Sequence, residues 1–205
     1  MKVTLESAWK SYESEWVFKN LDFQFTGGNT YAILGPNGSG KSTLLQVIAG
    51  NISLSKGNVS YNLNEAAIKV DDIYRYLGFS SPYQQLIEEF SLYEQVTFHN
   101  RFRQFVDGIA PMDVIARLGM EKDADKQVKN FSSGMKQRVK LALSILGESE
   151  MVLLDEPATN LDERGVRWFR ELLDQYLNSR LLIVSANRPE EYQFCSQSIN
   201  LMDFK

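Results

Sequence analysis

A glycine-rich run that ends in lysine and serine is the part of this sequence that most directly indicates chemistry. Residues 35–42 read Gly-Pro-Asn-Gly-Ser-Gly-Lys-Ser, which matches the pattern G-x-x-x-x-G-K-[ST]. Glycines let the backbone curl so that successive N–H groups point at a phosphate, and the lysine adds a full positive charge. The run therefore predicts a nucleotide phosphate site. Its candidate residues are Gly35, Pro36, Asn37, Gly38, Ser39, Gly40, Lys41, Ser42 and Thr43.

Two of these side chains have separate expected roles. Lys41 would contact the β- and γ-phosphates of a nucleoside triphosphate, and the Ser42 hydroxyl would be a ligand of Mg²⁺. A helix expected to begin near Lys41 adds the positive end of its dipole. The alternative is a plain glycine turn before a helix. We favour the phosphate site because the run lies between an expected strand, 30–34, and that helix.

A second motif consists of two carboxylates that follow an apolar segment. Residues 151–154 read Met-Val-Leu-Leu and are followed by Asp155 and Glu156. An apolar strand of a parallel sheet would place both acids at the sheet's carboxyl edge, where nucleotides bind. Asp155 is the second expected ligand of Mg²⁺, and Glu156 is the expected general base for an attacking water. Two acids that merely end a strand at the surface are common, but the phosphate loop makes that interpretation the weaker one.

The elements that must position these groups alternate between short apolar strands and amphipathic helices. This alternation predicts an α/β fold with a mostly parallel sheet covered on both faces. The expected strands are 1–10, 30–34, 59–63, 76–80, 151–154, 181–185 and 199–202. The expected helices are 41–49, a segment whose apolar face runs from Val96 to Val106, 111–118, 132–146 and 166–177. His99 lies on the apolar face of the second of these helices, where a packing or surface role is expected.

Composition excludes several classes of protein. The chain has 205 residues, a net charge of −4 and an isoelectric point near 5.2, so it has no overall positive field to hold nucleic acid. With one cysteine and one histidine, the chain has too few of these residues for an internal disulfide framework or a structural zinc site. Its apolar runs are far shorter than the roughly 20 residues of a membrane span. We also find no signal peptide, and we expect a cytoplasmic protein.

The segment 131–138, Phe-Ser-Ser-Gly-Met-Lys-Gln-Arg, distinguishes between classes of phosphate-loop protein. It resembles the signature motif of the ATP-binding cassette (ABC) ATPases, commonly Leu-Ser-Gly-Gly-Gln. Phe131, Ser133 and Met135 depart from that form, whereas Ser132 and Gly134 keep it. A serine and backbone N–H groups at a helix N-terminus can bind an anion. A simple helix cap would explain Ser132 alone, but not the position of the segment just before Asp155.

The resemblance extends along almost the whole chain and implies a fold of the P-loop ABC ATPase type. It implies a single domain over residues 1–205, with a nucleotide-binding core and an N-terminal antiparallel β subdomain in 1–80 and 131–205. An α-helical subdomain would be inserted at about 81–130. In this family two cassettes dimerise head to tail, and each ATP lies between one phosphate loop and the other subunit's signature motif. The expected cofactors are ATP and Mg²⁺, and the expected partner is a second copy or a related cassette.

Two further residues match the family pattern. Tyr12, in Lys-Ser-Tyr, corresponds to the aromatic residue that stacks on adenine, although alone it would be taken for a packing residue. Asp162, in Ala-Thr-Asn-Leu-Asp after the catalytic glutamate, corresponds to a residue at the subunit interface.

The chain departs from the family at two positions of the active site. The usual glutamine before the helical lobe falls near Pro82. Either Gln84 or Gln85 takes over its role or the role is lost, and we take Gln84 as the candidate. The usual histidine after the last core strand aligns with Asn187, which can donate a hydrogen bond but cannot carry a proton. We therefore expect ATP binding to be retained and hydrolysis to depend little on pH near neutrality.

The resemblance favours an ATPase subunit that drives transport through a separate integral membrane permease, on the inner face of the cell membrane. The loop 82–89 and the aromatic residues of the helical lobe are the expected contacts with that permease; Phe90, Leu92, Phe98, Phe102 and Phe105 are the candidates. The alternative is a soluble ABC ATPase acting on nucleic acid or ribosomes. The acidic charge and the presence of one cassette argue against it. A third possibility, a module that holds ATP without turnover, conflicts with the presence of Lys41 and Glu156.

Overall fold

The computed structural model describes all 205 residues, Met1–Lys205, and the chain forms two compact units. The first consists of Met1–Phe79, Ser149–Glu156 and Ser179–Lys205. The second consists of Ser80–Glu148 and Pro157–Asn178. No helix is both long and apolar enough to span a lipid bilayer.

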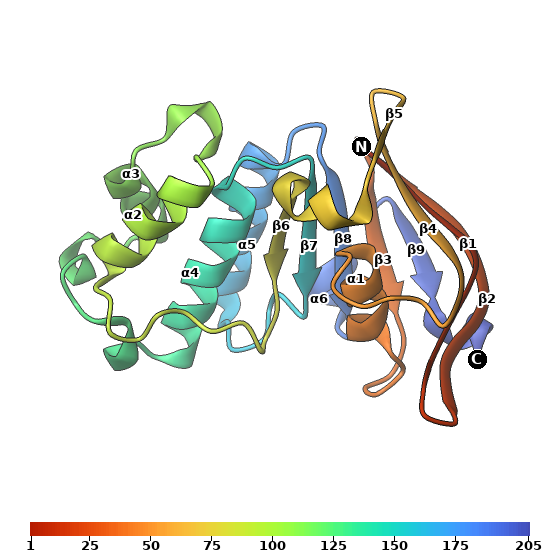
Figure 1. Cartoon of the computed structure of the whole chain (residues 1–205). Coiled ribbons are helices and arrows are strands. Elements are labelled where there is room, and N and C mark those ends of the chain that lie inside the picture. The colour runs from red at the N-terminus through yellow and green to blue at the C-terminus, as the bar shows by residue number, and fades with distance from the viewer. The chain divides into compact units, whose positions relative to one another are not determined.

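The first unit contains an antiparallel sheet and a largely parallel sheet (Figure 1). The antiparallel sheet has the order β2-β1-β4-β5, and the other has the order β6-β7-β8-β3-β9. Within the second sheet, β7 with β8, β8 with β3 and β3 with β9 pair in parallel. The strands are β1 (Lys2–Tyr12), β2 (Glu15–Thr26), β3 (Thr30–Leu34), β4 (Lys56–Leu63), β5 (Ala66–Ile68), β6 (Leu77–Ser80), β7 (Met151–Asp155), β8 (Leu181–Ala186) and β9 (Gln197–Asn200).

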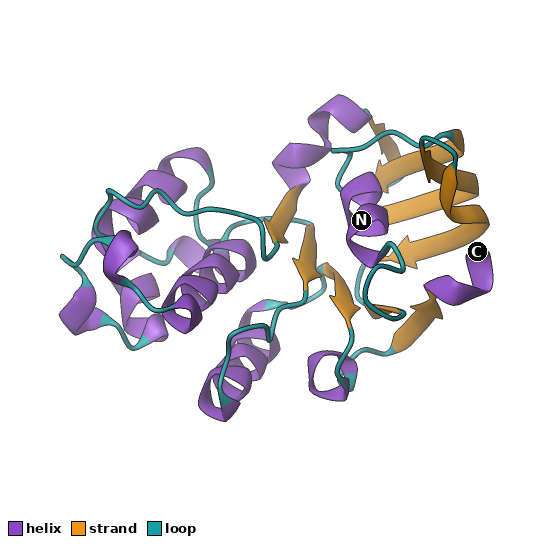
Figure 2. Ribbon diagram, turned by 90° about the horizontal axis from the view of Figure 1, so that it is seen from below, coloured by secondary structure: helices purple, strands orange, loops and turns teal.

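The apolar core of this unit is built around α1 (Lys41–Ile48). Four of its apolar side chains, Leu44, Leu45, Val47 and Ile48, are fully buried in a cluster with residues of both sheets. Every residue of β7 and β8 is buried, as is typical of parallel strands that are covered on both faces. The phosphate-loop helix is thereby fixed against the sheet (Figures 1 and 2).

The second unit is helical, as Figure 2 shows. Its α-helices are α2 (Leu92–Phe102), α3 (Pro111–Leu118), α4 (Ser133–Leu146) and α5 (Glu163–Tyr176). Trp168 on α5 donates from Nε1 to the Arg117 carbonyl at 2.7 Å, and the Arg138 guanidinium on α4 lies 4.6 Å from the Trp168 ring centroid. These contacts join α4 and α5 to the C-terminal end of α3.

Two expected elements end differently from their sequence pattern. The helix with the apolar face Val96–Val106 stops at Phe102, because the backbone is extended at Arg103 and the Asn100 side chain accepts the Phe105 N–H at 3.2 Å. The strand expected over 199–202 is Gln197–Asn200, followed by the 3₁₀-helix η5 (Leu201–Phe204). There the Asn200 side chain accepts the Met202 N–H at 3.1 Å and begins the turn.

His99 provides a pH-dependent contribution to stability. Its ring stacks on Phe105 at 5.6 Å, and burial, aided by the charge of Arg103, lowers its pKa from 6.5 to about 4. As the pH falls, His99 is therefore protonated in the unfolded chain before it is protonated in the folded one. The contribution of His99 to the free energy of unfolding is present above pH 6.5 and is lost between pH 6.5 and 4.

We expect His99→Gln to make the free energy of unfolding less dependent on pH in this window. The stability of the wild type should fall relative to the variant by about 2 kcal/mol between pH 7 and pH 5. Urea unfolding of both proteins at the two pH values measures the difference. An equal loss of stability in both proteins would show that folding does not lower the pKa of His99.

Candidate functional site

The phosphate loop joins the end of β3 to the start of α1. Gly35 has a φ of 152°, and a Cβ atom there would lie 2.6 Å from Ser39 Oγ. Gly40 caps α1 with a φ of 100°, and a Cβ atom there would overlap a methyl group of Val17. Side chains at these two positions would push the loop open, so the tight curl that presents N–H groups to a phosphate requires glycine.

Lys41 lies inside the curl of this loop. Its side chain is only 4% exposed, and Nζ donates to the carbonyls of Gly35 at 2.9 Å and Pro36 at 3.0 Å. Burial lowers the pKa of Lys41, and the charges of Glu156, Asp155 and Glu191 oppose that shift. A buried ammonium in a loop of backbone N–H groups fits an anionic phosphate. The buried Ser39 Oγ has no hydrogen-bond partner and is a further donor within the loop.

Asp155 and Ser42 are the two side chains of this site that could hold Mg²⁺ through oxygen atoms. Asp155 ends β7, is 2% exposed and accepts a hydrogen bond from Ser185 Oγ on β8. The two residues are directly paired in the parallel ladder, which fixes the carboxylate at the sheet's edge. No group of three or more His, Cys, Asp or Glu side chains could hold a metal by itself. A hydroxyl and one carboxylate, completed by phosphate oxygens and water, are the ligands that suit Mg²⁺.

Glu156 follows Asp155 and has a left-handed backbone, with φ of 46°. Such a conformation costs a non-glycine residue roughly 1 kcal/mol or more, so the contacts around Glu156 must hold its backbone in place. Asn187 Nδ2, after β8, donates to Glu156 Oε1 at 3.0 Å and to Asn37 Oδ1 at 2.5 Å. Three segments far apart in the sequence therefore meet at the carboxyl edge of β3, β7 and β8.

A pocket of about 360 Å³ opens at this edge. It is lined by Leu34, Gly35, Pro36, Asn37, Ala186, Asn187 and Tyr192. The pocket thus has the phosphate loop on one side and the Asn187 amide on the other, which provides space for a water and a terminal phosphate beside hydrogen-bond donors.

Tyr12 ends β1 in the same unit, and 48% of it is exposed. Lys10 Nζ lies 4.8 Å from the Tyr12 ring centroid and donates to the Ser53 carbonyl at 2.9 Å. The lysine therefore holds the ring beside the segment that follows α1, while the exposed area of the ring remains free for stacking.

Three of the four candidate residues in the helical unit have a local structural role at a helix start. Ser132 caps α4 by accepting the Met135 N–H at 3.2 Å, and Asp162 caps α5 by accepting the Gly165 N–H at 2.7 Å. A Cβ atom on Gly134 would lie 2.9 Å from the Asn160 carbonyl. Close packing of the two helix starts therefore explains these residue types, independently of any ligand.

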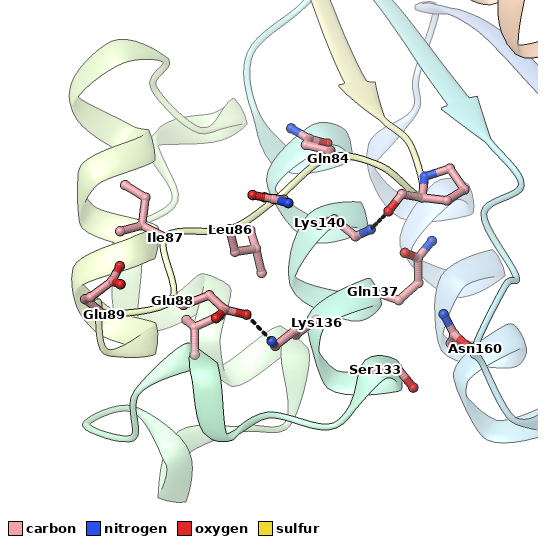
Figure 3. A pocket seen from close by; sticks show the side chains of 13 residues that line it. Gln84, Leu86, Ile87, Glu88, Glu89, Ser133, Lys136, Gln137, Lys140 and Asn160 are labelled. Carbon is pink, nitrogen blue, oxygen red and sulfur yellow. Dashed lines mark hydrogen bonds and ion pairs between the residues drawn. The ribbon is translucent and has the colours of Figure 1, made fainter.

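Gln84 is exposed and lines a pocket of about 750 Å³ in the helical unit (Figure 3). Pro82 occupies the second position of a turn that the Gln84 N–H closes on the Ser81 carbonyl at 3.2 Å. The buried Lys140 on α4 donates to the same Ser81 carbonyl at 3.0 Å. Proline thus suits the backbone of this turn at the position where the family usually has glutamine.

The structure brings together only some of the predicted site residues in one unit. Those that share the first unit with the phosphate loop are Tyr12, Lys41, Asp155, Glu156 and Asn187. The others, Gln84, Ser132, Gly134 and Asp162, belong to the second unit.

Sequence reasoning missed Ser185 and Glu191. Glu191 is 1% exposed and accepts the backbone N–H groups of Asn187 and Arg188 at the start of α6 (Pro189–Tyr192). The available signal was a helix-start pattern, with Pro189 at the first helical position and a glutamate at the third. Ser185 offered no such signal, because its contact with Asp155 depends on the pairing of β7 and β8.

The chain is similar in sequence to known proteins. A family model described as ABC transporter matches residues 18–159. The cytochrome c biogenesis ATP-binding export protein CcmA of Rhodopseudomonas palustris is 33% identical over 83% of both chains. The lantibiotic transport ATP-binding protein SrtF of Streptococcus pyogenes is 27% identical over 87% of this chain and 76% of that protein.

Among solved structures, the dimeric bacterial ABC transporter cassette MJ0796 superposes with a TM-score of 0.81 and is 23% identical. The match covers 97% of this chain and 93% of that one. The expected fold class, a P-loop cassette with an antiparallel β subdomain and a helical subdomain, is confirmed by this likeness.

Proposed function

This chain belongs to the ABC transporter family, and we propose that it pairs head to tail with a second cassette and drives transport through a separate membrane permease. The family membership expected from residues 131–138 is confirmed, and with it the ATPase activity. The observation that supports ATP hydrolysis as the driving reaction is the group formed by Lys41, Glu156 and Asn187 at one edge of the parallel sheet.

We propose a separate role in ATP hydrolysis for each of these side chains. Lys41 binds oxygens of the β- and γ-phosphates, and Ser42 with Asp155 would hold Mg²⁺, which neutralises phosphate charge when bound. Glu156 accepts a proton from water as the water oxygen attacks the γ-phosphorus, and ADP leaves as the Pγ–O bond breaks. Asn187 holds the Glu156 carboxylate in place through its 3.0 Å hydrogen bond. Tyr12 would stack on the adenine.

The helical unit would complete the site of the second copy. Ser132 and Gly134 lie at the start of α4, where backbone N–H groups can receive a γ-phosphate. Asp162 would lie at the interface between copies. The dimeric form of the similar cassette MJ0796 supports this arrangement.

A mixing experiment tests the head-to-tail arrangement. Lys41→Met disables the phosphate loop, whereas Ser132→Asp keeps a good helix cap and places a negative charge where a phosphate would bind. Each variant alone should be inactive. Since a mixed pair has one intact site, an equal mixture should recover about a quarter of the wild-type rate. A Ser132→Asp protein that is fully active alone would exclude a shared site.

The helical unit also offers the proposed permease contact. Leu92 and Phe105, two of the candidate contacts, are buried in the core at 0% and 3% exposure, so they are corrected to packing residues. Phe102 on α2 is 78% exposed, and the adjacent Phe98 packs against it at 4.9 Å between ring centroids. We place the docking surface on these two rings and on the loop beside Gln84, with the protein held at the inner face of the membrane.

Co-purification with a permease encoded by a neighbouring gene tests this contact. Phe102→Ser should reduce the amount of protein recovered with the permease and leave the ATPase rate of the isolated protein unchanged. Met112→Ser on α3, another exposed apolar side chain, is the matched control. Co-sedimentation with ribosomes instead of membranes would favour the alternative, a non-transport ABC ATPase.

We expect the pH profile of hydrolysis to reflect the asparagine at position 187. The Asn187 amide cannot titrate, so kcat of the wild type should be nearly flat between pH 6 and 8. Asn187→His should introduce a change in rate with a midpoint near the histidine pKa of about 6.5. Steady-state kinetics over this range measures both profiles. A steep wild-type profile centred near pH 6.5 would contradict the assignment.

A further inference from the structure

Glu191 is a buried carboxylate to which the hydrolysis steps above give no role. Only 1% of it is exposed, in contrast to its neighbour Glu190, whose side chain is 47% exposed. A buried carboxylate is costly unless donors surround it, so its position indicates a specific set of contacts.

Those contacts are with the backbone that follows β8. Glu191 Oε2 accepts the N–H of Asn187 at 3.1 Å and the N–H of Arg188 at 3.2 Å. Its Oε1 pairs with the Arg188 guanidinium at 3.6 Å. Because two successive N–H groups converge on one oxygen, the backbone at Asn187 has little freedom to rotate.

The amide at the end of the Asn187 side chain is held by two residues of the candidate site. Nδ2 donates to Glu156 Oε1 at 3.0 Å and to Asn37 Oδ1 at 2.5 Å. Asn187 itself is exposed, so these two hydrogen bonds and the direction of its backbone orient its side chain. The orientation of the amide toward Glu156 therefore depends on its backbone, which Glu191 fixes.

We propose that Glu191 is a positioning residue for the ATPase reaction: by binding the Asn187 and Arg188 N–H groups it aims the Asn187 amide at the Glu156 carboxylate. This inference depends on the proposed role of Glu156 as the base. Glu191 does not touch the reacting atoms and acts through Asn187.

Three variants distinguish a positioning role of Glu191 from an effect of its negative charge on kcat and from a loss of folding. Glu191→Ala removes the acceptor, and kcat should fall about tenfold while KM for ATP stays within twofold. Glu191→Gln retains an oxygen that can accept both N–H groups, so its kcat should stay within threefold of wild type. Glu190→Gln also removes one negative charge, at the preceding residue, and its kcat should equal that of wild type. A Glu191→Gln protein as slow as Glu191→Ala would overturn the proposal.

A double-mutant cycle tests whether Glu191 acts through Asn187. In an Asn187→Ala background the contact with Glu156 is already absent, so adding Glu191→Ala should change kcat by less than twofold. A further tenfold loss in that background would overturn the proposal. A Glu191→Ala protein with wild-type kcat would do the same.

A spectroscopic measurement provides a result that does not depend on turnover. In ¹H–¹⁵N NMR spectra, the side-chain amide of Asn187 should shift toward the values of a free asparagine in Glu191→Ala and remain in place in Glu191→Gln. An unchanged Asn187 signal in Glu191→Ala would overturn the positioning role. Absence of ATP hydrolysis by the wild type would instead overturn the proposed function, and the NMR comparison would still decide this inference.

Discussion

Glu156→Gln should bind ATP as the wild type does and hydrolyse it at least about a hundredfold more slowly. Glutamine has nearly the same shape as glutamate, and its carbonyl oxygen can accept the hydrogen bond from Asn187 Nδ2 that now reaches Glu156 Oε1. The backbone at this position, with φ of 46°, is tied to β8 because the Glu156 N–H donates to the Ser185 carbonyl at 3.0 Å. The substitution therefore removes the carboxylate that accepts the proton from water and leaves the positions of the neighbouring residues unchanged.

Single-turnover hydrolysis and equilibrium ATP binding measure the two effects separately. Glu163→Gln, at the exposed start of α5, is the matched control and should hydrolyse ATP at the wild-type rate. If Glu156→Gln hydrolyses ATP at the wild-type rate, another group must act as the base. If it loses ATP affinity instead, Glu156 contributes to binding and not to the chemical step.

Lys41→Met should weaken ATP binding about a hundredfold, since a buried charge-assisted contact with phosphate is among the stronger interactions in proteins. The Lys41 ammonium is 4% exposed and held by the carbonyls of Gly35 and Pro36. Burial lowers its pKa, so replacing it with methionine also removes an unfavourable desolvation. We therefore expect the loss to appear in ATP affinity and only weakly in stability.

Lys140→Met is the matched control for this experiment. Lys140 is also buried, at 8% exposure, and its Nζ also donates to two backbone carbonyls, of Ser81 and Pro82. Isothermal titration with ATP should show wild-type affinity for this variant and a large loss for Lys41→Met. Equal losses in both would mean that removing any buried lysine disturbs the fold, and a wild-type affinity in Lys41→Met would remove Lys41 from the phosphate site.

The ends of helices were predicted correctly where the sequence has capping residues. The helix expected at 111–118 is α3, because Pro111 suits the first helical turn and Gly119, with φ of 65°, ends the helix in a left-handed conformation. The helix from 132 likewise begins at a serine that caps it. Predictions failed where tertiary contacts override the pattern. Phe105 continues the apolar period of α2, but it packs in the core after the helix has ended.

The sequence by itself determined the phosphate loop, the two carboxylates after β7 and the family, because these depend on residue types at short, fixed spacings. Only the tertiary structure decided which distant groups meet. Asn37 and Asn187 are 150 residues apart in the chain, and they touch because β3 and β8 are neighbours in the parallel sheet. The burial of Glu191 was decided in the same way, since a periodic pattern predicts that a side chain faces the interior but not which partners it finds there.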